Sequence, residues 1–468
     1  MALTAPPTAL ANDPVKYQGM LADGKTTYLF VVPPDWNGTL FLYSHGLIND
    51  LKDNAALVSQ NKRIENWLLK QGFALAGGSY PGVGLVPVIP FMESQIAVLD
   101  KFDAVVGSPD RTIAWGLSLG GEITGYLVNA HSNRFDGAVA ICPYRLEGSV
   151  GNFNERLDHV FVLKTLLGFD SPLVNIGFGT GQRTRFLARE IEILDTAQQT
   201  AAGRARLALA EAMVNTPQWG VGPSDTEPAT DDFLTRQRNQ YLIARENVFY
   251  DGERNYYEHL VGDWDVGGVG SVTGGNFSWN VGVDYGDQLA RSASVRLVGA
   301  MYAAAPGIDL ATDLATLASA ARIAADPGAV EALQRVEPVF GDIGGTQVVT
   351  LALEADTVVW PNTVQGYGDA VATFGRSAQL RQLWVHRAGH CNFTAAEQIV
   401  AIQTLLARLD GSAWPSTAAS DLNAEAIALG TSYNHLSYPT QLEGPKYSDF
   451  DVPLFLRNYN AASTNPYP

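Results

Sequence analysis

The sequence predicts an α/β protein: a mostly parallel sheet that begins with antiparallel strands and is interrupted by a large, mainly helical insertion. Three observations support this fold class. Short apolar segments alternate with helical patterns from residue 73 to residue 141. Helical patterns alone then fill most of residues 145–336, and the alternation returns between residues 348 and 411. Such an alternation is typical of parallel strands joined by covering helices.

Two hairpin signals open the chain. Segments 15–21 and 26–32 flank Asp23-Gly24, and segment 39–43 follows Asn37-Gly38. Asp-Gly and Asn-Gly are the preferred tight turns between antiparallel strands, so these three segments are expected to be strands. The third of them ends in Ser44-His45-Gly46-Leu47.

Parallel strands are expected from residue 73 onward. Apolar runs predict buried strands at residues 73–76, 112–115, 137–141, 348–353 and 380–385. Helical spacing of apolar residues predicts helices between them, for example one that carries Ile64 and Trp67. The last helix begins at Thr394, with Glu397 three residues later as in a capping box, and stops before Gly411.

The helical stretch defines the domain organisation. Helical patterns occur at residues 160–167, 185–212, 233–260 and 295–325. We therefore divide the chain into four segments. They are a first core segment (1–144), a helical cap or lid (145–336), a second core segment (337–411) and an irregular C-terminal tail packed on the core (412–468).

Composition excludes several classes of partner. The net charge is −17, with 48 acidic and 31 basic residues, which argues against binding to nucleic acid or anionic membrane surfaces. No apolar run is long enough to span a membrane, so we expect a soluble protein. Residues 1–14 lack the features of a signal peptide, which fits a processed secreted or periplasmic protein and equally a cytoplasmic one. The sequence leaves the oligomeric state open.

The stretch Gly116-Leu117-Ser118-Leu119-Gly120 lies between a predicted strand and a predicted helix at residues 122–129. A serine with a glycine two places to either side can occupy a sharp strand-to-helix turn, with its hydroxyl clear of the backbone. The helix N-terminus then lies under the reacting carbon. Ser118 is therefore the candidate nucleophile.

A serine hydroxyl is a poor nucleophile at neutral pH and needs a base and an orienting acid. His390 follows the predicted strand at 380–385 and is the leading base. Asp356 follows the strand at 348–353, at the carboxyl edge where open α/β sheets place their sites. Glu354, inside that strand, is the rival acid.

The order Ser118, Asp356, His390, each after its own strand, resembles the α/β-hydrolase superfamily over about residues 15–145 and 347–410. The resemblance implies a catalytic triad of these three residues. In that family a His-Gly pair after an early strand opens the oxyanion loop, and His45-Gly46 matches it. The amides of Leu47 and Leu119 are then expected to form the oxyanion hole.

The Cys beside His390 loosely resembles tannase-like and feruloyl-type esterases, in which a Cys beside the serine bonds a Cys beside the histidine. This sequence departs from that pattern because Leu117 and Leu119 flank Ser118. The two cysteines, Cys142 and Cys391, exclude a disulfide framework and a Cys-based zinc cluster. They could form one disulfide or stay as separate buried thiols, and the sequence does not decide.

The resemblance implies a serine hydrolase that cleaves carboxylic esters through an acyl-enzyme, without a metal or an organic cofactor. The expected substrate is a small ester with an apolar or aromatic acyl group. The side chains predicted to contact it come from the loops and from the aromatic cluster of the lid; they are His45, Tyr80, Trp264 and Trp279.

Two other functions remain open. An amide or peptide hydrolase, such as an aminopeptidase, would need acidic lid residues for the substrate ammonium group, and four are available: Glu246, Asp251, Glu253 and Glu258. A non-catalytic binding protein on a hydrolase scaffold is the alternative from another class. Such relatives usually lose a triad member, and none is missing here.

Overall fold

The computed structural model describes residues 13–48, 50–83, 88–170, 180–220, 226–249, 274–336, 338–411, 413–436 and 441–457. Within these ranges nine strands form one sheet, in the order β1-β2-β4-β3-β5-β6-β7-β8-β9. Their bounds are β1 Val15–Met20, β2 Thr27–Val32, β3 Thr39–Ser44, β4 Ala74–Gly78, β5 Arg111–Leu117, β6 Gly137–Ile141, β7 Gln347–Ala355, β8 Leu380–Ala388 and β9 Tyr447–Ser448.

The strands from β3 to β8 run parallel to one another, whereas β1, β2 and β9 pair antiparallel. The predicted fold class, an α/β-hydrolase fold with antiparallel N-terminal strands, is therefore confirmed. Parallel strands that enter the sheet in the same direction place their carboxyl ends at one edge. That edge carries the turns after β3, β5, β7 and β8.

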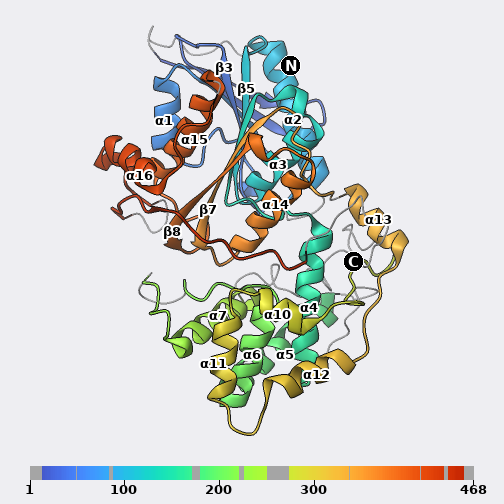
Figure 1. The fold of residues 1–468 in the computed structure, drawn as a ribbon. Helices are drawn as coiled ribbons and strands as arrows, with labels where there is room; N and C mark the ends of the chain where they lie inside the picture. The colour runs from blue at the N-terminus through green and yellow to red at the C-terminus, as the bar shows by residue number, and fades with distance from the viewer. Residues whose placement is uncertain are drawn as a thin grey trace.

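Helices cover both faces of the sheet (Figure 1). One face packs against α1 (Lys62–Lys70), α15 (Ala395–Asp410) and α16 (Ala419–Ala428). The other packs against α2 (Val88–Val105), α3 (Leu119–Ala130) and α14 (Pro361–Thr373). Successive strand residues point to opposite faces, as Leu40 and Phe41 do, so both faces bury apolar side chains. A strand covered on both faces reads as an unbroken apolar run, which is why these strands could be recognised from the sequence.

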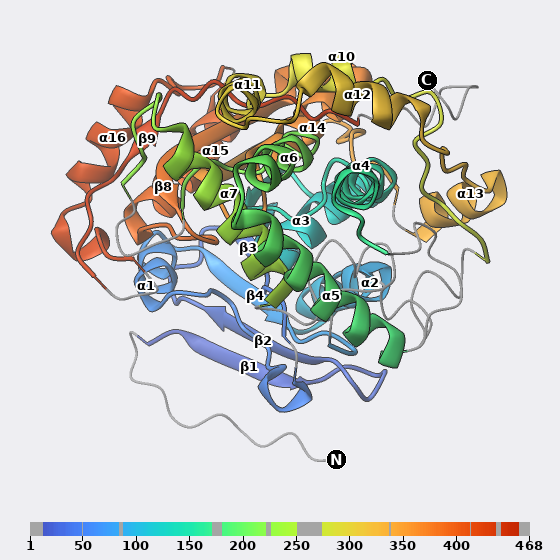
Figure 2. The same cartoon turned by 90° about the horizontal axis from the view of Figure 1, so that it is seen from below.

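Eight helices of the described chain lie between β6 and β7. They are α4 Ser149–Leu167, α5 Thr180–Gln198, α6 Ala201–Ala212, α7 Phe233–Phe249, α10 Tyr285–Arg291, α11 Val295–Ala303, α12 Leu310–Ser319 and α13 Pro327–Val336. Most of them gather beyond the carboxyl ends of β7 and β8, as Figure 1 shows, and in front of the sheet when it is seen from below (Figure 2). They bury an apolar cluster of their own, centred on α4 and α6.

The structure corrects three details of the sequence prediction. The helical pattern at 185–212 is two helices: α5 ends at Gln198, and Thr200 caps α6 by accepting a hydrogen bond from the Gly203 amide. The pattern at 295–325 is likewise divided, into α11 and α12. The tail is not wholly irregular, since α16 and β9 belong to it and β9 extends the sheet.

Four short 3-10 helices complete the described secondary structure, at Leu51–Asp53, Ser132–Arg134, Ser377–Gln379 and Thr431–Tyr433. None of the helices in the described ranges combines the length and the apolar character that crossing a membrane requires.

Candidate active site

Ser118 forms the turn between β5 and α3. Its φ of 58° lies in the left-handed region, which is unusual for a residue with a side chain and is typical of a sharp turn at a functional site. The two flanking glycines make the turn possible. A Cβ atom on Gly116 or on Gly120 would overlap with backbone atoms, in the second case with the carbonyl oxygen of Ser44 at the end of β3.

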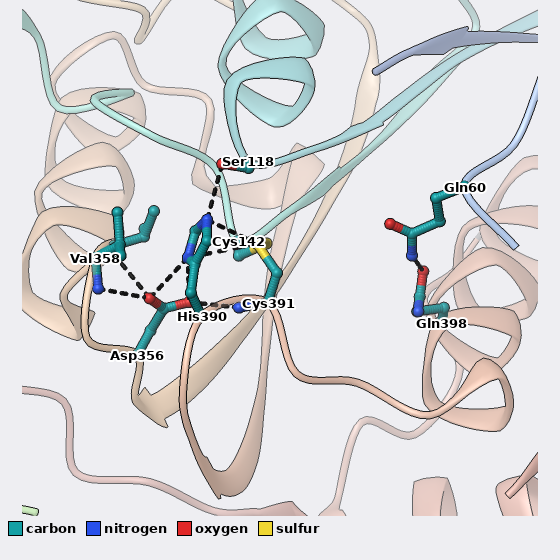
Figure 3. Close-up of a disulfide and its surroundings, with 9 residues drawn as sticks. Gln60, Ser118, Cys142, Asp356, Val358, His390, Cys391 and Gln398 are labelled. Atoms are coloured by element: carbon teal, nitrogen blue, oxygen red, sulfur yellow. Dashed lines mark hydrogen bonds and ion pairs between the residues drawn. A yellow bond between two sulfur atoms is a disulfide. The ribbon is translucent and has the colours of Figure 1, made fainter. Parts of the chain in front are cut away.

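His390 lies two residues beyond β8, and its ring points at Ser118 (Figure 3). The distance from Nε2 of His390 to Oγ of Ser118 is 2.9 Å. On its other side, Nδ1 lies 3.0 and 3.2 Å from the two carboxylate oxygens of Asp356. Because a carboxylate only accepts, Nδ1 carries the proton, and Nε2 presents a lone pair to the serine hydroxyl.

Asp356 follows β7 and is buried. Its Oδ1 accepts hydrogen bonds from the amides of Val358 and Val359, both at 2.9 Å. Its Oδ2 accepts one from the amide of Cys391 at 3.0 Å. The carboxylate is therefore held in one orientation by three backbone donors while it faces His390.

The rival acid, Glu354, lies elsewhere. Its Oε2 is 2.7 Å from Nδ1 of His386, and its Oε1 accepts a hydrogen bond from the hydroxyl of Ser448. The His386 ring also stacks on Trp219, with ring centroids 4.9 Å apart. The structure thus brings Asp356 and not Glu354 to His390.

Cys142 and Cys391 form a disulfide, with their Cα atoms 5.6 Å apart, which resolves the alternative left open by the sequence. Cys142 directly follows β6, and Cys391 directly follows His390 (Figure 3). The Cys391 sulfur lies 3.4 Å from Nε2 of His390. The bridge therefore ties the histidine loop to the strand beside the serine turn.

The two amides predicted to form the oxyanion hole belong to Leu47 and Leu119. Leu119 is the first residue of α3, so its amide has no partner within the helix. A Cβ on Gly46 would lie 3.8 Å from Cβ of Ser118, so the loop after β3 packs against the turn. Neither amide donates a hydrogen bond to any other residue that the structure describes.

His45 and Tyr80, both predicted to contact the substrate, lie against each other. Their ring centroids are 4.0 Å apart, and the Tyr80 hydroxyl donates a hydrogen bond of 2.6 Å to the His45 carbonyl. Both side chains are buried, and burial lowers the pKa of His45, which keeps its ring neutral.

Of the two lid tryptophans, Trp264 lies outside the described residues. Trp279 is buried in a cluster within the insertion. The other buried members of that cluster are Val150, Phe153, Phe277, Ala329, Val330 and Leu333. The structure therefore places Trp279 among the buried side chains of this cluster.

The sequence did not point to Trp219 and Gly220, which follow α6. Trp219 packs with Ala355 and Ala388, the last residues of β7 and β8. A Cβ on Gly220 would lie 3.2 Å from the Ala355 carbonyl oxygen, one residue before Asp356. A lone Trp-Gly pair carries no periodic signal, so only the folded chain reveals that this part of the insertion lies beside the acid and the base.

Metal-ligating residue types come together at one place in the described chain. Ligand atoms of Cys142, Asp356 and Cys391 lie within 4.8 Å of one another. Because the two sulfur atoms are bonded to each other, they offer no thiolate to a metal ion.

No family model matches the chain. The o-phthalyl amidase of Xanthobacter agilis is 30% identical over 437 residues, which cover 88% of this chain and 91% of that protein. An esterase from Aspergillus oryzae superimposes with a TM-score of 0.41 and 11% identity, over 86% of this chain and 80% of the other. Feruloyl esterase B from Aspergillus oryzae has a TM-score of 0.38 and 12% identity, over 86% and 81% of the two chains.

Proposed function

This chain is a hydrolase of the α/β-hydrolase superfamily, in the same family as the o-phthalyl amidase of Xanthobacter agilis, and we propose that it cleaves acyl bonds through Ser118, His390 and Asp356. One observation carries the proposal. A continuous series of contacts runs from Oγ of Ser118 through both ring nitrogens of His390 to the carboxylate of Asp356. This arrangement can remove a proton from the hydroxyl as it attacks a carbonyl carbon.

In the proposed mechanism, Nε2 of His390 takes the Ser118 proton while Oγ bonds to the acyl carbon. Asp356 stabilises the imidazolium that forms, because Nδ1–H already points at its carboxylate. The amides of Leu47 and Leu119 receive the oxyanion of the tetrahedral intermediate. His390 then protonates the leaving group, and water activated by the same ring releases the acid from Ser118.

The preferred bond is proposed to be an amide, because the relative that aligns over most of this chain is named for o-phthalyl amides. The ester predicted from the sequence is the second candidate. Esters and amides pass through the same tetrahedral intermediate and acyl-enzyme, and they differ in the leaving group that His390 must protonate. Ester and amide substrates both present an acyl group to Ser118, and we propose that this acyl group is aromatic.

We also propose that the insertion acts as a lid. Ser118 is only 8% exposed, and Trp219 of the insertion packs on the last residues of the two strands that precede the acid and the base. Aromatic rings at that place would favour an aromatic acyl group by about 25 cal/mol per Å² of apolar area removed from water.

A disulfide also persists best in an oxidising compartment, which favours a secreted or periplasmic location.

The test compares matched substrates that differ in one part only. They are the 4-nitroanilide and the 4-nitrophenyl ester of one acyl group, in o-phthalyl, benzoyl and acetyl series. Ser118→Ala serves as the blank, which also corrects for spontaneous cleavage of o-phthalyl derivatives by their own carboxylate. We expect turnover of aromatic anilides to fall at least about 10³-fold in Ser118→Ala.

Each other result has a definite meaning. Turnover of the esters alone would make the protein an esterase. A preference for acetyl over benzoyl groups would contradict the proposal that the enzyme binds an aromatic acyl group. Equal rates in the wild-type protein and Ser118→Ala would contradict the proposed mechanism and favour a non-catalytic binding protein.

A further inference from the structure

In the proposed mechanism, the peptide group between Gly46 and Leu47 supplies one N–H donor of the oxyanion hole. Its N–H belongs to Leu47, and its carbonyl belongs to Gly46. Because a peptide group is planar, fixing the carbonyl also fixes the direction of the N–H. Nδ1 of His45 lies 2.7 Å from that carbonyl oxygen and, since the oxygen can only accept, donates to it. The His45 side chain therefore sets where the Leu47 amide points.

Tyr80 in turn holds His45. Its hydroxyl donates to the His45 carbonyl at 2.6 Å, and its ring lies against the imidazole with centroids 4.0 Å apart. Phe91 also stacks on the Tyr80 ring, with centroids 4.7 Å apart and the rings nearly parallel. Burial raises the pKa of Tyr80 well above its usual value, so the hydroxyl keeps the proton that it donates.

Asn54 fixes the backbone of Tyr80 from the far side. Its side-chain amide donates to the Tyr80 carbonyl at 2.8 Å, and its carbonyl oxygen accepts from the Tyr80 amide at 3.0 Å. The same amide group also donates to the Gly82 carbonyl at 3.2 Å. A series of direct contacts therefore leads from Asn54 through Tyr80 and His45 to the Gly46–Leu47 peptide.

We propose that Tyr80 is a positioning residue for the oxyanion hole, and that it acts through His45 on the Leu47 amide rather than by touching the substrate. The inference rests on the proposed function. A donor placed where charge develops stabilises the transition state more than the bound substrate. Loosening that donor should therefore lower kcat and leave KM almost unchanged, whereas the loss of a substrate contact should raise KM.

The experiment is Tyr80→Phe in the full chain, which removes one hydroxyl and keeps the stacked ring. We expect kcat to fall about tenfold with KM unchanged, as for the loss of one intramolecular hydrogen bond. The affinity for an aryl trifluoromethyl ketone, which forms an oxyanion on the serine, should fall by the same factor. The affinity for benzoate, which forms none, should stay the same.

Tyr367→Phe is the matched control. Tyr367 is equally buried, on α14, and its hydroxyl has no hydrogen-bond partner among the residues that the structure describes. We expect this variant to keep wild-type kcat and ketone affinity. If Tyr80→Phe does not fold, Asn54→Leu replaces it, and a fall in kcat of about threefold is expected because the Tyr80 backbone loses its clamp.

Wild-type kcat and ketone affinity in Tyr80→Phe would overturn the inference, as would an increase in KM with kcat unchanged. Labelling of Ser118 by a fluorophosphonate separates this failure from failure of the proposed function. If Ser118 is labelled and Tyr80→Phe behaves as wild type, only the positioning role is lost. If Ser118 is not labelled in the wild-type protein, the proposed function fails first.

Discussion

The sheet of the hydrolase core and the helices of the insertion bury very different residues. Strands such as β3 and β6 carry buried apolar residues on both faces. In contrast, α4 is buried from Ser149 to Leu163 and takes charged side chains with it, among them Glu155 and Asp158. Each of these carboxylates finds partners in distant segments: Glu155 accepts from the Asn362 side chain and from the Leu456 amide.

Because of this difference, we expect the core and the insertion to respond differently to substitution and to pH. The core holds the candidate triad at the carboxyl ends of its strands. The insertion holds carboxyl groups that burial makes hard to ionise. Burial raises the pKa of Glu147 to about 7 and, together with the nearby Glu211, that of Glu190 to about 8. We therefore expect substitutions in the core to change catalysis, and those in the insertion to change stability as a function of pH.

The largest effect is expected in the core, for Asp356→Asn. An amide at this position favours the wrong imidazole tautomer, so kcat should fall about 10⁴-fold while the fold is kept. The control is Glu354→Gln, two residues earlier and within β7, because the Glu354 carboxylate pairs with His386. Steady-state kinetics with circular dichroism decides, and nearly wild-type turnover in Asp356→Asn with an inactive Glu354→Gln would reverse the assignment.

A smaller effect is expected when Cys142 and Cys391 are both replaced by Ala. The bridge holds the loop whose Cys391 amide binds Asp356 and whose His390 faces Ser118. We expect the unfolding free energy to drop by about 2–4 kcal/mol, together with a decrease in kcat of about tenfold. Denaturant titration and kinetics measure both. Loss of stability with full kcat would show that the loop is positioned without the bridge.

The smallest effect is expected in the insertion, for Glu190→Gln, and it should depend on pH. Glu190 is fully buried, and neither carboxylate oxygen has a hydrogen-bond partner in the described structure. Below the pKa of this carboxyl in the unfolded chain, about 4.5, it is protonated in both the folded and the unfolded state. Ionisation therefore does not reduce the stability of the folded protein there. Between about 4.5 and 8 only the unfolded chain ionises, so stability falls as the pH rises through this range.

Glu190→Gln should remove this loss. Its Tm should equal that of the wild type near pH 4 and exceed it near pH 8.5. The control is Glu192→Gln on the same helix, whose side chain is exposed and pairs with Arg189. A constant difference in Tm between Glu190→Gln and the wild type at all pH values would show that Glu190 is not buried as a neutral acid.

The same contrast explains what could be predicted from the sequence. Ser118, Asp356 and His390 could be predicted as a triad because each lies at most two residues beyond an apolar strand, and parallel strands bring such positions to one edge. The cap of α15 was predicted from Thr394 and Glu397, and the structure shows both reciprocal hydrogen bonds. These features depend on local pattern alone.

The insertion gave weaker signals because its pattern is not local. The breaks between its helices depend on single caps such as Thr200, and buried charges on α4 hide the apolar face that marks a helix. The contact of Trp219 with β7 and β8 joins segments more than a hundred residues apart. Tyr80 was predicted to contact the substrate, and the hydrogen bond from its hydroxyl to the His45 carbonyl joins residues 35 positions apart, so no local sequence pattern reveals it.

The central claim is that Ser118 is the nucleophile, and the most direct measurement is mass spectrometry of the protein after reaction with a fluorophosphonate. We predict a single adduct, on the peptide that contains Ser118. It should form rapidly because His390 activates the hydroxyl. His390→Ala should slow the labelling without moving it to another residue. An adduct on a different serine, or labelling of Ser118 at the same rate without His390, would contradict the account.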